Sequence, residues 1–100
     1  MKLKIRKMLE NNTLTMYLEG HLDTTVAPEL EKEMKNSLDG VKELVLDLEK
    51  LDYISSSGLR ILLSTHKNMS KQGKMKIINA NEMILEIFEI TGFLDILNVE

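Results

Sequence analysis

The sequence contains no cysteine, no tryptophan and only one proline. Without cysteine, neither a disulfide framework nor a thiolate metal site can form, which fits a reducing cytosol. No apolar run approaches the roughly 18 residues that a membrane-spanning helix needs. The opening MKLKIRK alternates apolar and basic side chains, which is typical of a strand and unlike a signal peptide. These absences predict a cytoplasmic location without membrane contact.

Charged residues of both signs are interspersed along the chain. There are 13 Lys and Arg against 16 Asp and Glu, a net charge of -3. This distribution lacks the basic footprint of a protein that binds nucleic acid directly. One hundred residues suffice for one modest hydrophobic core, so residues 1–100 are predicted to form a single domain.

The pattern of apolar residues predicts four strands, the first two by alternation of apolar and polar side chains. Leu3 and Ile5 begin the first, and a second runs through Leu14 to Leu18. Asn11-Asn12 between them is a turn signal, so these two strands form a hairpin. The further strands are 43–48, whose sequence ELVLDL is apolar enough to be covered on both faces, and 74–79.

Helical periodicity predicts helices between and after these strands. Asp23, Thr24 or Thr25 is placed to cap the first helix, with Pro28 in its first turn. The second helix spans 57–72, with one apolar face made of Leu59, Leu62, Leu63, His66 and Met69. Asn81 is placed to cap a third helix, which Gly92 ends.

Strands that alternate with helices predict crossover units with parallel strands. Together with the hairpin they give an α/β fold with a mixed sheet of four to five strands and three to four helices. The loops at the carboxyl ends of parallel strands share one edge of a sheet, where ligands usually bind. Loops 20–25, 49–57 and 79–81 should meet there. The side chains expected to be neighbours are those of Asp23, Asp47, Ser57 and Asn81.

Three consecutive serines, Ser55, Ser56 and Ser57, precede Gly58 at the start of the second helix. One of them is expected to cap the helix, and the glycine to permit close packing of its first turn. A helix N-terminus also tolerates an anion, because it carries unpaired amides and about half a positive charge. A serine there could therefore be phosphorylated without loss of the fold.

Other candidate sites are weaker. His21 and His66 have no further ligands at metal-binding spacing, and His66 is expected to be a hydrogen-bonded core residue. A hydrolase is disfavoured because the sequence has no Gly-x-Ser-x-Gly elbow, and a nucleotide-binding glycine loop is also missing. Ile61 falls outside the predicted apolar face. It is either an exposed anchor for a partner or packs on Tyr53-Ile54.

The segments GHLDTTVAPEL, VLDLEKLDYISSSGLRILL and ITGFLDIL resemble the anti-sigma factor antagonists of bacteria, which are STAS domain proteins. The resemblance covers the whole chain and implies a single STAS-like domain. It places the phosphorylation acceptor at Ser57, directly before Gly58, with Ser56 as the second choice. It also implies that Asp23 lies beside the acceptor. Many members have Asp two positions before the acceptor, where this chain has Ser55.

The resemblance further implies how such a protein works. The unphosphorylated antagonist binds an anti-sigma factor, itself an ATP-dependent serine kinase, and so frees the sigma factor for transcription. Phosphorylation by that kinase reverses the binding, and a phosphatase resets the switch. The chain would be a monomer or weak dimer, neither an enzyme nor dependent on a cofactor. The expected partner-binding residues are Asp23, Thr24, Thr25, Ser55, Ser56, Gly58 and Ile61.

Two other functions remain open at this point. The chain could be an unphosphorylated STAS scaffolding subunit of a transport or sensory complex. It could instead be a small module that binds a nucleotide or phosphate at the same helix N-terminus.

Overall fold

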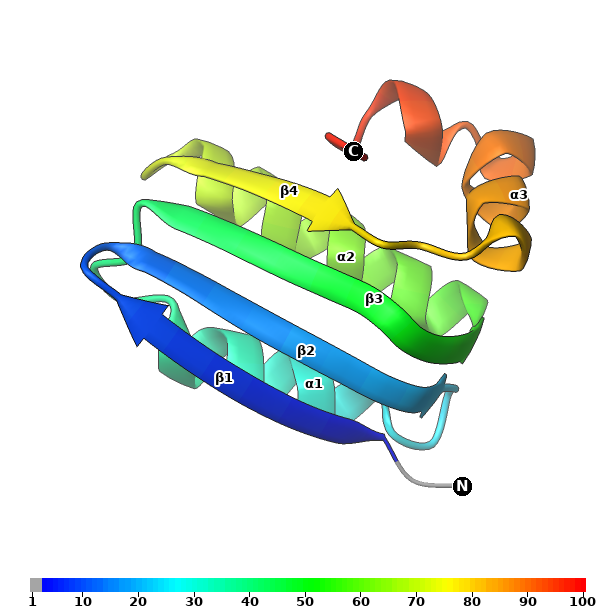
Figure 1. Cartoon of the computed structure of the whole chain (residues 1–100), viewed down its shortest axis with the longest axis horizontal. Helices are drawn as coiled ribbons and strands as arrows, with labels where there is room; N and C mark the ends of the chain where they lie inside the picture. Colours follow the sequence, from blue (N-terminus) through cyan, green and yellow to red (C-terminus); the bar gives the residue numbers. More distant parts are fainter. Residues whose placement is uncertain (1–2) are drawn as a thin grey trace.

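A computed structural model describes residues 3–100. One mixed sheet contains β1 (Lys4–Glu10), β2 (Thr13–Leu22), β3 (Glu43–Ile54) and β4 (Lys74–Ile78), in that spatial order (Figure 1). β1 is antiparallel to β2, whereas β2, β3 and β4 are parallel. The predicted mixed sheet with an opening hairpin is confirmed. Asn11, in the turn, has the positive φ of 58° that a tight hairpin requires.

The helices form a second layer on one face of this sheet. α1 (Ala27–Ser37) and α2 (Ser56–Ser70) cover that face, while α3 (Glu82–Thr91) and the short 3₁₀-helix η1 (Phe93–Asp95) lie at the β4 side (Figure 1). The parallel pairs are joined through α1 and α2, as expected of crossover units. Within residues 3–100, no helix has the length and apolar character needed to span a bilayer.

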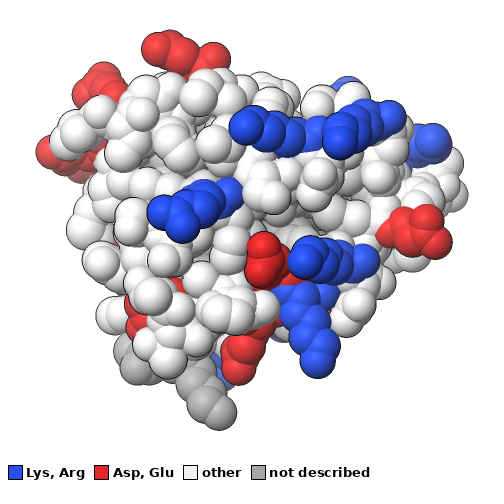
Figure 2. Space-filling model, turned by 180° about the vertical axis from the view of Figure 1, so that it is seen from behind, with Lys and Arg blue, Asp and Glu red and all other residues white. Residues whose placement is uncertain are grey.

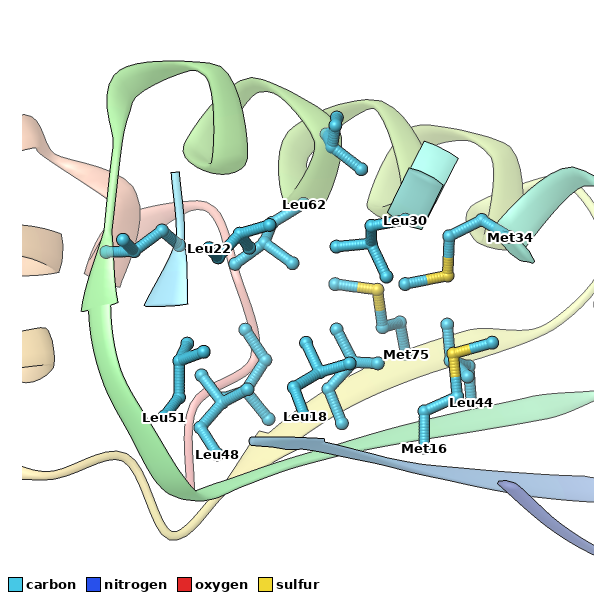
Figure 3. Packing of buried hydrophobic residues seen from close by; sticks show 14 of the residues in the cluster. Met16, Leu18, Leu22, Leu30, Met34, Leu44, Leu48, Leu51, Leu62 and Met75 are labelled. Carbon is cyan, nitrogen blue, oxygen red and sulfur yellow. The ribbon is translucent and has the colours of Figure 1, made fainter. Parts of the chain in front are cut away.

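The core lies between the sheet and the two covering helices (Figure 3). Along β2 every second side chain is buried, starting with Leu14, because successive strand residues point to opposite faces. Leu30 of α1 and Leu62 of α2 meet these side chains from the helical layer. Fully buried side chains include Met16, Leu18, Leu22, Leu44, Leu46, Leu48, Leu51, Met69, Ile77 and Phe88.

β3 is longer than its sequence suggests and runs through much of the predicted loop 49–57. Its pairing with β2 continues to Leu22 opposite Ile54, after register shifts near Glu19 and Gly20. Within residues 3–100, the helices cover β3 on one face only (Figure 1). Val45 points to the other face and is nonetheless buried, with Thr15 and Lys76 beside it on the flanking strands.

The buried face of α2 is rotated from the predicted one. Ile61 and Thr65 are buried, whereas Leu63 and His66 are only half-buried. The reason is that α2 contacts α1 as well as the sheet, which buries a second side of the helix. Of the two alternatives for Ile61, the expectation of an exposed anchor is therefore wrong. So is that of a hydrogen-bonded His66, whose buried Nδ1 has no hydrogen-bond partner within residues 3–100.

The end of the chain lies along the outer edge of β4. The Ile77 amide donates to the Asn98 carbonyl at 2.8 Å, and the Glu100 amide donates to the Ile77 carbonyl at 2.8 Å. These bonds make a single parallel bridge between Ile77 and Val99, not a fifth strand.

The expected residues at both ends of α3 are confirmed. Asn81 accepts from the Ile84 amide at 2.8 Å, and Gly92 has a φ of 82°.

Leu62→Ala tests whether the contact between α2 and the sheet stabilises the fold. Leu62 is fully buried, so truncation should lower the free energy of unfolding by about 3 kcal/mol, through lost burial and a residual cavity. The control is Leu9→Ala, because Leu9 is 65% exposed on β1 and should change it by less than about 0.5 kcal/mol. Urea unfolding followed by circular dichroism measures both. Equal effects of the two substitutions would contradict the packing described.

Candidate functional site

The site lies where β2 and β3 end side by side. The Ser55 amide donates to the Leu22 carbonyl at 2.8 Å, one residue beyond the pairing of Leu22 with Ile54. Because the two strands are parallel and stop together, the residues that follow each strand leave the sheet at the same edge. The segments brought together in this way are 23–26 and 55–58.

Asp23 organises the first of these segments. Its Oδ1 accepts from the Thr25 amide at 2.9 Å and from the Val26 amide at 3.1 Å. Its carbonyl accepts from the Ala27 amide at 3.0 Å. The N-cap residue of α1 is Val26, with no side-chain hydrogen bond, so none of the three predicted residues occupies that position. Asp23 instead holds the preceding turn, which leaves Thr24 exposed at its tip.

The three serines have different environments. Ser55 is the N-cap of α2, is only 8% exposed, and its Oγ accepts from the Gly58 amide at 3.2 Å. Ser56 is exposed. Ser57 is half-buried and its Oγ donates to Thr24 Oγ1 at 3.4 Å, a long and weak hydrogen bond. Ser55 thus has the capping role, and Ser57 is the serine that contacts the first loop.

Gly58 allows the first turn of α2 to approach the strand ends closely. A Cβ atom at this position would lie 2.7 Å from Leu22 Cγ and 3.0 Å from Ile54 Cγ1. Both contacts are shorter than side chains normally make, so a larger residue would push α2 away from the strands. The predicted close packing at this glycine is confirmed. This close packing sets how far Ser57, the preceding residue, lies from the edge of the sheet.

A shallow hollow between α1 and α2 adjoins Ser57. Two oppositely charged, exposed residues line it, Glu31 on α1 and Arg60 on α2. Arg60 lies three positions after Ser57 and therefore on the same side of the helix. That spacing is visible in the sequence, but Arg60 was not among the predicted site residues. The complete lining is Thr24, Ala27, Pro28, Glu31, Ser57, Arg60 and Ile61.

Not all predicted neighbours meet at this site. Asp47 lies within β3 opposite Tyr17 and Ile78, because the strand continues well beyond it. Its Oδ2 accepts from Asn79 Nδ2 at 3.2 Å. Asn81 caps α3 and its Nδ2 donates to the Leu51 carbonyl at 3.0 Å. The expectation that Asp47 lies at the end of its strand beside Ser57 is wrong.

Two further features bear on what the site can do chemically. Within residues 3–100, no group of three or more His, Cys, Asp or Glu residues is arranged to hold a metal ion. The ring of His21 lies 6.0 Å from that of Tyr53 at a tilt of 44°, beside the same strand ends. What the site offers is a hydroxyl at the N-terminus of a helix, with an exposed threonine and an arginine nearby.

The chain is similar to known proteins over nearly its whole length. The family model described as STAS domain matches residues 4–100. BtrV of Bordetella bronchiseptica, assigned as an anti-sigma factor antagonist, is 39% identical over 101 aligned residues, which cover 99% of this chain and 85% of BtrV.

Solved structures share the fold at lower sequence identity. An anti-sigma factor antagonist from Mycobacterium paratuberculosis superimposes with a TM-score of 0.89 at 20% identity, covering 98% of this chain and 85% of that one. The Bacillus cell fate determinant SpoIIAA in its phosphorylated form gives a TM-score of 0.74 at 17% identity, covering 99% and 91%.

Replacing each of the first two serines by alanine separates their roles. Ser55→Ala removes the oxygen that accepts from the Gly58 amide and should lower the free energy of unfolding by about 1 kcal/mol. The matched control is Ser56→Ala, one position along, which removes an exposed hydroxyl and should change it by less than about 0.5 kcal/mol. Chemical denaturation gives both values. A greater loss at Ser56 would show that the cap has been assigned to the wrong serine.

Proposed function

Because the chain belongs to the STAS domain family and a close relative is assigned as an anti-sigma factor antagonist, we propose the same function for it, switched by phosphorylation of Ser57. In its unphosphorylated form the chain binds an anti-sigma factor serine kinase and frees the sigma factor. Phosphorylation by that kinase ends the binding, and a phosphoserine phosphatase restores it. The chain acts in the cytoplasm as a binding partner and kinase substrate, with no catalytic role and no cofactor.

The observation that carries the assignment of Ser57 is its position between the helix tip and the first loop. Ser57 is half-buried and its Oγ makes one weak hydrogen bond, to Thr24 at 3.4 Å, so binding of the hydroxyl by a kinase would break little structure. Ser55 is a poor acceptor, because its oxygen is buried and caps α2. Ser56 is exposed, which keeps it as the second candidate.

The surroundings of Ser57 favour a phosphate that leaves the fold intact. Phosphorylation adds about -1.5 to -2 charges near neutral pH. The N-terminus of α2 compensates such a charge by up to about 2 kcal/mol. Arg60 lies one turn further along the same side of the helix and adds a positive charge. These local charges stabilise the phosphate within the domain. They do not offset the free energy needed to desolvate the phosphate when a partner surface binds over it.

The proposed partner surface consists of the exposed residues around this hydroxyl. Thr24, Thr25 and Ser56 are exposed and would contact the partner directly. The remaining predicted residues support this surface without being exposed on it. Asp23 holds the loop, and Ser55 and Gly58 set the position of α2. Ile61 is buried and lines the hollow.

The serine found where many family members have aspartate fits this proposal. Asp and Ser are about equally good N-cap residues. Ser55 already provides the capping oxygen to the Gly58 amide. The substitution therefore preserves the helix start that positions Ser57, while removing one negative charge beside the acceptor.

Incubation with the cognate kinase and ATP tests the acceptor. Wild-type chain and Ser56→Ala should each take up one phosphate, mapped to Ser57 by mass spectrometry, whereas Ser57→Ala should take up none. Each variant differs from wild type by one exposed or half-buried hydroxyl, so circular dichroism should show equal folding. A phosphate on Ser56 in the Ser57→Ala chain would refute the assignment.

Binding to the unmodified kinase tests the switch. Ser57→Ala should bind within about threefold of wild type, because the oxygen makes only one weak bond. Ser57→Asp should bind roughly a hundredfold more weakly, which corresponds to a mismatch of about 3 kcal/mol. Isothermal titration calorimetry measures the dissociation constants, and Thr13→Asp, on β2 away from the site, controls for the added charge. Equal affinity of Ser57→Asp and wild type would exclude control by charge.

A further inference from the structure

Exposed apolar side chains concentrate on α3 and η1. Among residues 3–100, seven large hydrophobic side chains are exposed, and four of them belong to this region. Ile90 is 76% exposed, more than any other of the seven. Exposed hydrophobic side chains that cluster in this way commonly mark an interaction surface. The four are Met83, Ile90, Leu94 and Ile96.

The same region carries a row of glutamates. Glu82, Glu86 and Glu89 recur at helical spacing along α3 and line a hollow together with Ile90 and Leu94. None of the three glutamates forms an ion pair within residues 3–100. This surface, called here the acidic α3 surface, therefore offers both unpaired negative charge and exposed apolar groups.

The opposite pattern occurs on α2. Arg60, Lys67 and Lys71 line a shallow depression along the outer side of this helix, together with Leu63. These three basic residues also form no ion pair within residues 3–100. Seen from the helical side, several basic side chains are spread across the molecule, and one group of acidic side chains lies at the edge where α3 lies, with other acidic side chains elsewhere on this face (Figure 2). The residues on α2 are called here the basic α2 surface.

The two surfaces match in spacing as well as charge. Arg60 and Lys67 are two helical turns apart on α2, and Glu82 and Glu89 are two turns apart on α3, about 11 Å in each case. Each surface also includes leucine or isoleucine beside the charges. The chain thus carries, on two different helices, two surfaces of opposite charge with equal spacing between charged residues.

We propose that the occupant of the acidic α3 surface is a second copy of this chain, docked through its basic α2 surface. Because the contact joins two different surfaces, it is head-to-tail, and each pair of copies leaves one acidic α3 surface and one basic α2 surface free. Exposed ion pairs contribute little individually and are screened by salt. The association is therefore weak, rises with protein concentration and falls with ionic strength. It goes beyond the proposed switch at Ser57 and requires neither kinase nor phosphate.

Sedimentation velocity on the purified, unphosphorylated chain tests this contact through charge reversal. One variant carries Glu86→Lys with Glu89→Lys, and the other carries Lys67→Glu with Lys71→Glu. At low salt, wild type should show a mass above that of the monomer as its concentration approaches about 1 mM, the affinity range of weak contacts. Either variant alone should associate at least tenfold more weakly, since like charges then face each other.

Mixing the two variants gives the decisive result. In the mixture, the basic α3 of one faces the acidic α2 of the other, and the unaltered surfaces also match. Association should return to at least the wild-type level. Lys32→Glu with Lys42→Glu is the control, because it makes the same charge change as the α2 variant, at exposed positions outside α2 and α3. Circular dichroism verifies that all variants are folded.

Three outcomes would overturn the proposal. They are a monomeric wild type at every concentration, association that the charge reversals leave unchanged, and a mixture no more associated than its separate components. A wild type that stays monomeric would leave the acidic α3 surface to a different, basic partner. Because the measurement uses neither kinase nor ATP, its failure leaves the assignment of Ser57 unaffected, and failure of that assignment leaves this contact unaffected.

Discussion

The hydrogen bond from the Ser55 amide to the Leu22 carbonyl is the contact on which the candidate site depends. It joins the ends of β2 and β3, two parallel strands separated in sequence by the whole of α1. It extends the pairing of the two strands by one residue, so the loop held by Asp23 and the first turn of α2 leave the sheet at the same edge. Gly58 allows the first turn of α2 to pack directly on these strand ends, since no larger residue fits against Leu22 and Ile54. The geometry of the backbone at the strand ends therefore determines where the three serines lie.

The arrangement assigns structure and chemistry to neighbouring residues. Ser55 provides the capping oxygen and is buried, so the helix start does not depend on the hydroxyl proposed to be modified. Ser57, two residues later, makes only a weak bond to Thr24 and can change its charge with little effect on the fold. A site that must switch a partner while its domain stays folded requires this separation of roles.

Local signals in the sequence predicted much of this structure correctly. The hairpin, the cap at Asn81 and the helix end at Gly92 follow from short-range chemistry, which the sequence displays directly. The errors concern long-range packing. β3 continues through polar residues because β2 pairs with it there, so Asp47 lies within the strand. Ile61 is buried because α1 packs on a second side of α2, which helical periodicity cannot reveal. That loops 20–25 and 49–57 meet at one edge was predictable, because the carboxyl ends of parallel strands share an edge.

The bridge between Ile77 and Val99 also has a consequence for solubility. A sheet edge with free amides and carbonyls is a template on which other chains can add strands and aggregate. Residues 98–100 occupy part of that edge on β4. The opposite edge strand, β1, carries Lys4 and Arg6, whose charges oppose edge-to-edge pairing with another sheet. Each edge of this small sheet thus carries a feature that opposes indiscriminate strand addition.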